Sequence, residues 1–277
     1  MSVTEKLGAT VGFQLRQLYA RFTAEAVRDD TSSSEFVVLD TLADAPVDSQ
    51  RELAERLGIN RTIMVRLVDR LTDAGHVVRT RNPENRRSYV LSITDAGRVA
   101  LDGMRRVVSD RDAQVTAALD DSERRRLAEL LAGLLPEPDG PAVRSIEYLA
   151  AQAHYRQRRY GDSLLADVGL RTRHFGPLTA LELLAPCPQQ DVANYLGITG
   201  PAAAEVVDEL VQAGLVSRGQ DEHDRRRYAL ELTELGRERL TDVHDAIDRL
   251  EVDVTGALGA DGYEELYSLL TKALQPV

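Results

Sequence analysis

Arginine is concentrated in residues 50–98, which hold ten arginines and six acidic residues. Side chains able to bind DNA bases stand near the middle of this stretch: Asn60, Arg61, Thr62, Met64, Val65 and Arg66. Arginine can donate two hydrogen bonds to guanine, asparagine and threonine can bond base edges or phosphates, and valine or methionine can contact a thymine methyl group. The sequence therefore predicts contacts to double-stranded DNA, with Arg61 and Arg66 as the main side chains.

A second group of polar side chains follows: Arg79, Arg81, Asn85, Arg86 and Arg87. These residues surround the turn Asn82-Pro83-Glu84-Asn85, which separates two alternating segments, 77–81 and 88–93, typical of short strands. Arginines at the tip of a hairpin suit the narrow and strongly negative minor groove, where recognition depends on shape more than on base edges. We therefore expect this group to bind the minor groove.

Local signals define the helices that carry the first group. Ser49-x-x-Glu52 is a capping box that opens one helix, and Gly58 ends it. Asn60 caps the next helix, which Gly75 closes. Helix, glycine turn, helix and then hairpin is the order of a winged helix-turn-helix, and it places the helix that follows Asn60 for the major groove.

Further helical patterns flank this region. Apolar residues at spacings of three and four predict a helix over residues 4–28 and a shorter one over 36–42. Thr94 caps a long helix that runs to about residue 118. Asp120 or Asp121 starts the last helix, which ends near residue 135.

The whole arrangement occurs twice. Shifting the sequence by 139 residues aligns residues 50–98 with 189–237 without a gap, and 19 of the 49 pairs are identical. Average residue usage would give about 3 identities. Three prolines and a glycine in residues 136–141 cannot continue a helix. We therefore predict lobe one (residues 1–135), a proline-rich linker (136–141) and lobe two (142–277).

Lobe two departs from lobe one where base contacts are expected. Its aligned stretch holds five arginines and nine acidic residues, and Gly200 and Glu205 replace Arg61 and Arg66. The residues that remain suited to DNA are Thr199, Arg218, Asp224, Arg225, Arg226 and Arg227. A glutamate repels phosphate, so we expect lobe two to bind the DNA backbone and shape, and the operator to be asymmetric.

The stretch ELAERLGIN-RTIMVRLVDRLTDAGHVVRTRNPENRRSYVLSITDAGR resembles the MarR family of bacterial regulators in its helix-turn-helix, its wing and the following Leu-x-x-Thr-x-x-Gly. The resemblance covers nearly all of lobe one and, more loosely, lobe two. It implies a mainly helical fold with small hairpin wings, in two winged helix-turn-helix lobes. Family members usually form homodimers through their first and last helices, so the resemblance implies an intramolecular pseudo-dimer that functions as a monomeric chain.

The resemblance also bears on the wing tip and on regulation. The family's wing carries an aspartate two residues before an arginine, which here are Asn85 and Arg87 in lobe one and Asp224 and Arg226 in lobe two. Asparagine can accept a hydrogen bond but lacks the charge of aspartate. Many members are repressors that a small, often aromatic, effector releases from DNA.

The resemblance implies an effector pocket but does not locate it. Five side chains lie on or near the segments that would line it: Tyr19, His154, Tyr155, Tyr160 and His174. Ordinary core or interface packing explains the same residues, so both interpretations stay open. In the expected mechanism, the ligand favours a spacing of the two lobes that no longer fits one helical turn of DNA.

Composition narrows the class of protein. Hydrophobic residues make up 43% and charged residues 29%, as in globular proteins. No apolar run approaches the ~20 residues of a membrane span, and the first residues lack signal-peptide features, so we expect a cytoplasmic protein. The single cysteine, Cys187, excludes an internal disulfide. The histidines lack metal-site spacing, and neither a phosphate loop nor a nucleophile elbow appears, so we expect no metal, no cofactor and no enzymatic activity.

The net charge of −11 leaves one alternative open. The chain could be a ligand-sensing or protein-interaction module whose DNA binding is weakened or lost. The ten arginines of residues 50–98 favour DNA binding, because neutralising phosphates requires clustered basic residues.

Overall fold

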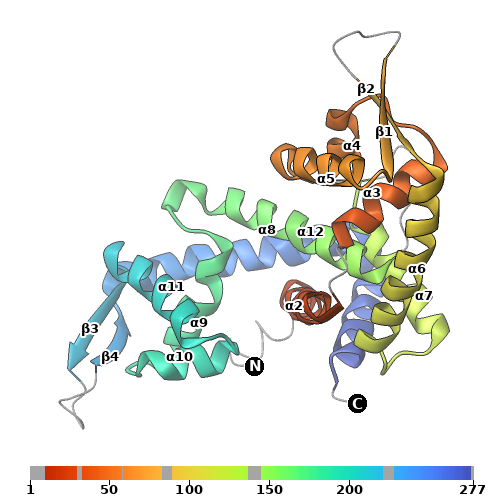
Figure 1. The fold of residues 1–277 in the computed structure, drawn as a ribbon. Coiled ribbons are helices and arrows are strands. Elements are labelled where there is room, and N and C mark those ends of the chain that lie inside the picture. Colours follow the sequence, from red (N-terminus) through yellow and green to blue (C-terminus); the bar gives the residue numbers. More distant parts are fainter. Residues whose placement is uncertain are drawn as a thin grey trace. The chain divides into compact units, whose positions relative to one another are not determined.

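The computed structural model describes residues 10–29, 33–57, 59–82, 89–136, 145–220 and 228–275. Over these residues the fold is mainly helical with two small antiparallel hairpins, which confirms the predicted fold class (Figure 1). Lobe one contains, in chain order, α2 (Val11–Asp29), α3 (Ser33–Asp44), α4 (Gln50–Arg56), α5 (Arg61–Asp73), β1 (Val77–Arg81), β2 (Tyr89–Ile93), α6 (Asp95–Val115) and α7 (Asp121–Gly133).

Lobe two repeats this order with short 3-10 turns inserted before its second helix. Its elements are α8 (Ile146–Leu164), η1 (Ala166–Val168), η2 (Thr172–His174), α9 (Phe175–Leu184), α10 (Gln189–Leu196), α11 (Gly200–Gln212), β3 (Val216–Gln220), β4 (Tyr228–Leu232) and α12 (Glu234–Ala273). The winged helix-turn-helix part of lobe one, residues 33–93, is named head one, and its counterpart in lobe two, residues 175–232, is named head two.

The two heads keep the register of the sequence repeat. Helices α5 and α11 are the second helices of the two helix-turn-helix units and are named the recognition helices. They begin 139 residues apart, and so do β1 and β3. Val77 pairs with Ile93 in the first hairpin, and Val216 pairs with Leu232 in the second. The repeat therefore describes two copies of one backbone arrangement.

Each head has a core that its recognition helix helps to form. In α5, Met64, Leu67, Val68 and Leu71 are buried, which is the spacing of one helix face. They pack with buried residues of α3 and β2. In α11 the aligned residues Ala203, Val207 and Leu210 are buried. The opposite face of each recognition helix is left to solvent.

Hydrogen bonds and close backbone packing form a junction between the wing of head one and α6. The Thr94 hydroxyl accepts a hydrogen bond from the Gly97 N–H at 3.0 Å and donates one to the Gly75 carbonyl at 2.7 Å. A Cβ on Gly97 would lie 2.2 Å from the carbonyl oxygen of His76. This close contact with the backbone explains why the Thr-x-x-Gly pattern has glycine at its last position.

Lobe two contains the same junction. Thr233 accepts from the Gly236 N–H at 3.0 Å and donates to the Gly214 carbonyl at 2.7 Å. A Cβ on Gly236 would lie 2.1 Å from the carbonyl oxygen of Leu215. The geometry that orients the long helix against the wing is thus common to both lobes.

The last helices of the two lobes begin differently. Asp120 caps α7, because its side chain accepts from the N–H groups of Ser122 and Glu123 in a capping box. The aligned position in lobe two is Gly259, which has a φ of 74° and interrupts α12. Lobe two therefore turns its last helix through a left-handed glycine, where lobe one uses a side-chain cap.

Packing divides the chain into two compact units that differ from the two lobes. One unit comprises Gln14–His154 and Ala257–Val277, and the other comprises Met1–Phe13 and Tyr155–Gly256. Head one belongs to the first of these and head two to the second. Each unit therefore includes helical segments from both halves of the sequence.

Candidate nucleic-acid interface

The helix starts of head one follow the predicted caps. The Ser49 side chain accepts from the Glu52 N–H at 3.1 Å, and the Asn60 side chain accepts from the Thr62 N–H at 2.9 Å. Asn60 thus fixes the start of α5.

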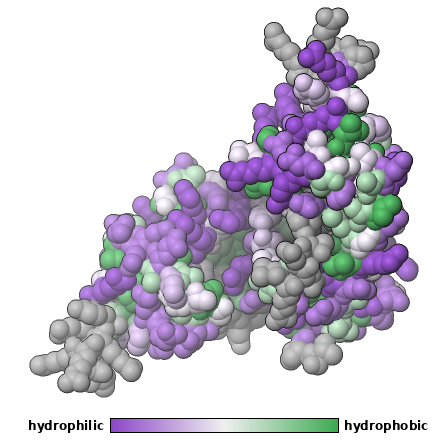
Figure 2. Space-filling view, viewed as in Figure 1, coloured by the Kyte–Doolittle hydropathy of each residue, from purple (hydrophilic) through white to green (hydrophobic). Residues whose placement is uncertain are grey.

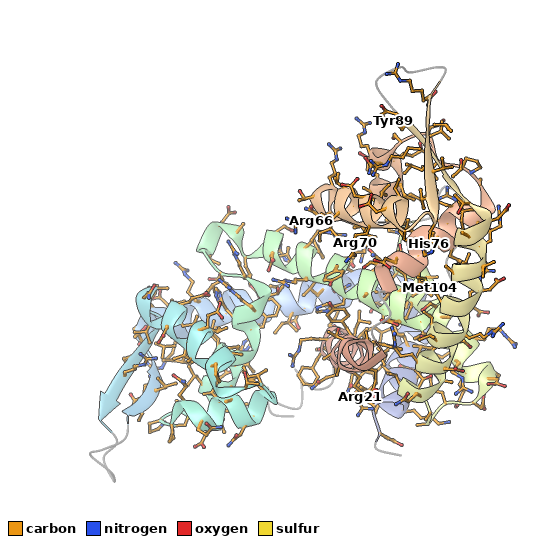
Figure 3. All side chains as sticks on the ribbon, in the orientation of Figure 1. Arg21, Arg66, Arg70, His76, Tyr89 and Met104 are labelled. Atoms are coloured by element: carbon orange, nitrogen blue, oxygen red, sulfur yellow. The ribbon has the colours of Figure 1, made fainter. Side chains whose placement is uncertain are left out.

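The outward face of α5 carries four of the predicted base contacts. Arg61, Thr62, Val65 and Arg66 are all exposed. Hydrophilic residues predominate over α4 and α5 in Figure 2, with isolated hydrophobic residues among them. Arg66 and Arg70 project from the same helix (Figure 3). These side chains can donate to guanine, bond phosphate oxygens or contact a thymine methyl group.

Two residues of this helix differ from the sequence prediction. Met64 is fully buried, so its predicted base contact is wrong. It lies three and four residues before Leu67 and Val68 and belongs to their buried stripe. Ile63, which the prediction missed, is 52% exposed. Ile63 lies outside the buried stripe of the helix, and this position in the sequence could have predicted its exposure.

Ion pairs hold some arginines of head one on the protein. Arg61 Nη2 lies 3.0 Å from Glu55 Oε1, with both side chains more than half exposed. Exposed pairs of this kind contribute ~0–1 kcal/mol, so exchanging Glu55 for a phosphate costs Arg61 little.

Two exposed side chains lie at the ends of the wing strands of head one. Arg81 is exposed, and so is Tyr89 on the facing strand, which the sequence prediction missed (Figure 3). A tyrosine on a strand that alternates towards solvent was the available signal. Asn85, Arg86 and Arg87 lie outside the described residues.

Both heads join the wing to the recognition helix by the same ion pair. Arg79 of β1 pairs with Asp69 of α5 in head one. Arg218 of β3 pairs with Asp208 of α11 in head two. Arg79 and Arg218, which the sequence assigned to DNA, therefore also position the wing strand.

Head two presents a different outward face. Thr199 caps α11 by accepting from the Ala202 N–H at 3.4 Å. Pro201, Ala202 and Glu205 are the exposed residues of the first turns. They offer one carboxylate and no basic side chain. The predicted wing residues Asp224, Arg225, Arg226 and Arg227 lie outside the described residues.

One contact of the recognition helix differs in charge between the heads. In head one, Arg70 of the recognition helix lies 3.1 Å from Glu35. At the aligned positions of lobe two, Glu209 of α11 lies 3.1 Å from His174 Nε2. Arg173 adds a second contact to Glu209 at 2.7 Å. The charge carried by the recognition helix changes sign, while the link to the preceding segment is kept.

The five predicted effector residues do not line one described cavity. Tyr19 and His154 stack with ring centroids 4.8 Å apart. Tyr155 and Tyr160 are each 37% exposed. His174 is buried, accepts from the Arg171 N–H at Nδ1 and contacts Glu209 through Nε2. For His174, these contacts match ordinary packing.

A cavity of about 480 Å³ lies elsewhere, in lobe two. It is lined by the end of α9, the following loop, β4 and the start of α12, namely Leu181, Glu182, Ala185, Pro186, Glu231, Leu232, Arg237, Leu240, Thr241 and His244. Arg98 of lobe one aligns with Arg237 of this lining, and its Nη1 donates to the Ala43 carbonyl at 3.3 Å. The lining of the cavity combines apolar side chains with acidic and basic ones.

No group of three or more His, Cys, Asp or Glu side chains among the described residues is arranged to hold a metal ion. The described helices include none that is both long and apolar enough to span a bilayer.

Comparison with known proteins gives matches in both halves of the chain. Two models described as MarR family match residues 31–89 and residues 168–227. A relative from Thauera aromatica, "Putative transcriptional regulatory protein for hcr operon", is 30% identical over 133 residues, which are 46% of this chain and 80% of the relative.

Solved structures match over one lobe's length. The "Transcriptional repressor, CouR, bound to a 23-mer DNA duplex" is 29% identical, with a TM-score of 0.43, covering 46% of this chain and 91% of that one. The S. aureus MepR–DNA complex is 24% identical, with a TM-score of 0.43, covering 46% and 94%. Wild-type MarR from E. coli in its apo form is 23% identical, with a TM-score of 0.40, covering 46% and 95%.

Proposed function

This chain belongs to the MarR family of transcriptional regulators, and we propose that it is a cytoplasmic repressor that binds DNA as a single-chain pseudo-dimer with two unequal half-sites. One observation carries the proposal. Head one exposes Arg61, Thr62 and Arg66 on its recognition helix, whereas head two exposes Pro201, Ala202 and Glu205 on the same turns.

Head one supplies the base contacts in this proposal. The exposed face of α5 offers guanidinium, hydroxyl and aliphatic groups within two helical turns, the set that the major groove can distinguish. Arg66 and Arg70 lie one turn apart on α5 and add positive charge. Each base pair that such contacts recognise contributes ~1–3 kcal/mol of discrimination.

Head two supplies mainly backbone and shape contacts. Its recognition helix presents alanine and glutamate, so base recognition by hydrogen bonds is weak there. The arginines of its wing sequence suit the minor groove. The two halves of the operator would then differ in how strongly their base sequence matters.

Repression and effector release complete the proposal. A ligand that prefers one arrangement of the heads would shift the population towards a form that no longer fits the operator. The cavity of about 480 Å³ in lobe two is a candidate site for this ligand, since its volume lies within the range of small-molecule sites.

Three variants test whether head one supplies the base contacts and head two the backbone contacts. Arg61→Ala and Arg66→Ala should each weaken operator binding and relax sequence preference by ~1–3 kcal/mol. Arg226→Ala should weaken binding to all duplexes alike. The measurement is a gel shift with the DNA upstream of the chain's own gene, over a range of salt concentrations, beside an unrelated duplex.

The same experiment distinguishes the proposed function from the competing interpretation. A steep loss of affinity with salt supports phosphate neutralisation, whereas no binding at low salt would favour a ligand-sensing or protein-interaction module. Equal, sequence-independent effects of all three variants would refute the unequal half-sites. So would a footprint with equal base-specific protection on two identical half-sites.

A further inference from the structure

The first turn of α8 is bound to α6 through two consecutive residues. Asp112 accepts from the N–H groups of Ile146 at 2.9 Å and Glu147 at 3.0 Å. Arg111 Nη1 lies 2.7 Å from Glu147 Oε2, and both side chains are buried. Because a buried pair is costly to break, these contacts fix where α8 begins.

The next residue, Tyr148, extends this connection to head one. Its ring packs against the core of head one, and its hydroxyl donates a hydrogen bond to the Leu57 carbonyl at 3.0 Å. Leu57 is the C-cap residue of α4, where backbone carbonyls lack partners within the helix. Tyr148 therefore satisfies a carbonyl at the end of the first helix of the helix-turn-helix.

The position of Leu57 gives this bond its importance. Leu57 lies three residues before Asn60, the N-cap of the recognition helix. Ile59 also packs against the core of head one, and its N–H donates to the Ala54 carbonyl. The tyrosine hydroxyl thus adds an anchor from outside the head to the short connection that orients α5.

The repeat makes this anchor specific to one head. The residue of the first repeat that aligns with Tyr148 is Ala9, which has no hydroxyl, and Leu250 aligns with Arg111. By the alignment of the repeats, the counterpart of Tyr148 cannot give head two the same bond, and head one is the head that carries the exposed arginines on α5. The connection also runs from a residue of lobe two to the head of lobe one.

We propose that Tyr148 is a positioning residue for DNA recognition: through Leu57 it holds the turn before α5, so the placement of α8 governs the affinity of head one for its half-site. This inference rests on the proposed DNA-binding function. Tyr148 acts without touching DNA, and the helix of one repeat thereby influences the recognition helix of the other.

Tyr148→Phe is the decisive variant, because it removes the hydroxyl and keeps the ring. The operator Kd should rise roughly 3- to 10-fold, the effect of one lost hydrogen bond. The Kd for an unrelated duplex and the salt dependence of binding should stay unchanged, because no phosphate contact is removed. Tyr267→Phe is the matched control, since it makes the same change at a partly buried side chain of α12, outside both heads.

Hydrogen exchange on the free protein tests the positioning step without DNA. Tyr148→Phe should speed exchange of the Ile59 and Met64 amides relative to amides of head two, whereas Tyr267→Phe should not. An operator Kd within twofold of wild type, equal losses on both duplexes, or unchanged exchange at Ile59 and Met64 would each overturn the proposal.

These readouts separate the two proposals. If the wild-type chain shows no preference for its upstream DNA, the proposed function fails. The exchange measurement then still decides whether Tyr148 holds the turn before α5.

Discussion

In head one the recognition helix exposes Arg61, Val65 and Arg66, whereas the aligned residues of head two are Gly200, Ala204 and Glu205. The buried residues of α11 nevertheless align with three of the four buried residues of α5. Since the exposed residues make few contacts with their own head, they can differ without loss of the fold. The duplicated backbone therefore tolerates different surfaces, and one half can lose base contacts that the other keeps.

The contacts that the heads share are those that orient their parts. Both wings are paired with the recognition helix through an arginine and an aspartate. Both long helices start with a threonine cap and a closely packed glycine. The residues that set the geometry of a head are thus shared, whereas the exposed residues that we propose to contact DNA differ between the heads.

The largest effect is expected at the glycines that follow the wings. Gly97→Ala and Gly236→Ala each place a methyl group about 2 Å from a backbone carbonyl oxygen, which cannot move as a flexible side chain would. Each variant should lose about 3 kcal/mol or more of unfolding free energy, or fail to fold. Urea unfolding measures this loss.

Helical glycines with open space provide the controls. Gly103 in α6 and Gly256 in α12 have nothing within 4 Å of an added Cβ. Alanine at either position should stabilise the chain by up to about 1 kcal/mol, because alanine favours helix. Loss of stability in only one of the two wing-glycine variants would contradict the idea that both heads share this geometry.

The second prediction concerns Asp112 of α6, whose carboxylate accepts hydrogen bonds at the start of α8 in lobe two. Burial raises the pKa of Asp112 to about 6, although the carboxylate accepts two N–H groups of α8. The folded state then binds a proton more tightly than the unfolded state, whose aspartate has a pKa near 3.9. The free energy of unfolding should therefore fall by about 2–3 kcal/mol as pH rises from about 4 to above 6.

Asp112→Asn should flatten this decline in urea unfolding measured at several pH values. The aligned residue of lobe two, Glu251, accepts from the Val11 N–H at 3.3 Å and is only partly buried. Glu251→Gln should therefore change the pH dependence less. A larger change from Glu251→Gln than from Asp112→Asn would contradict the difference between the two caps.

Sequence signals were sufficient for the parts of the fold that depend on local contacts. Asn60, Thr94 and Asp120 each cap a helix through N–H groups two or three residues away. The hairpins follow from alternation over five-residue strands. The exposed Arg61 and Arg66 follow from the same helical period that buries Leu67 and Leu71.

The remaining features depend on packing between distant segments. Tyr148 and Leu57 are 91 residues apart, and Asp112 and Ile146 are 34 apart, so no periodicity could pair them. Met64 stands between two other apolar residues, so composition alone left its phase open. The division into two compact units that mix segments of both lobes follows from the same long-range packing.

A smaller effect should follow from exchanging charge between the recognition helices. Glu205→Arg gives head two the residue type that head one has at Arg66, and removes a carboxylate that repels phosphate. Operator binding should tighten by about 1–2 kcal/mol, and the salt dependence should steepen by about one phosphate equivalent. Gel shifts at several salt concentrations measure both quantities.

Arg66→Glu makes the reverse change in head one and should weaken binding by at least as much. Glu264→Arg alters the net charge equally on an exposed position of α12 outside both heads, and should leave affinity close to wild type. If Glu205→Arg had no more effect than Glu264→Arg, the recognition helix of head two would lie away from DNA.

The smallest effect is expected from the ion pair that both heads share. Arg79→Ala and Arg218→Ala each break a pair whose members are partly exposed, so each should lower the unfolding free energy by no more than about 1 kcal/mol. Their effects on DNA binding should be similar, because each removes the same anchor between a wing strand and a recognition helix. Asp69→Asn and Asp208→Asn break the same pairs but keep the arginines. If the arginines serve only as anchors, each aspartate variant should weaken operator binding as much as the corresponding arginine variant. A markedly larger loss from Arg79→Ala than from Asp69→Asn would instead assign Arg79 a direct contact to DNA, and the heads would differ at a position where their structures agree.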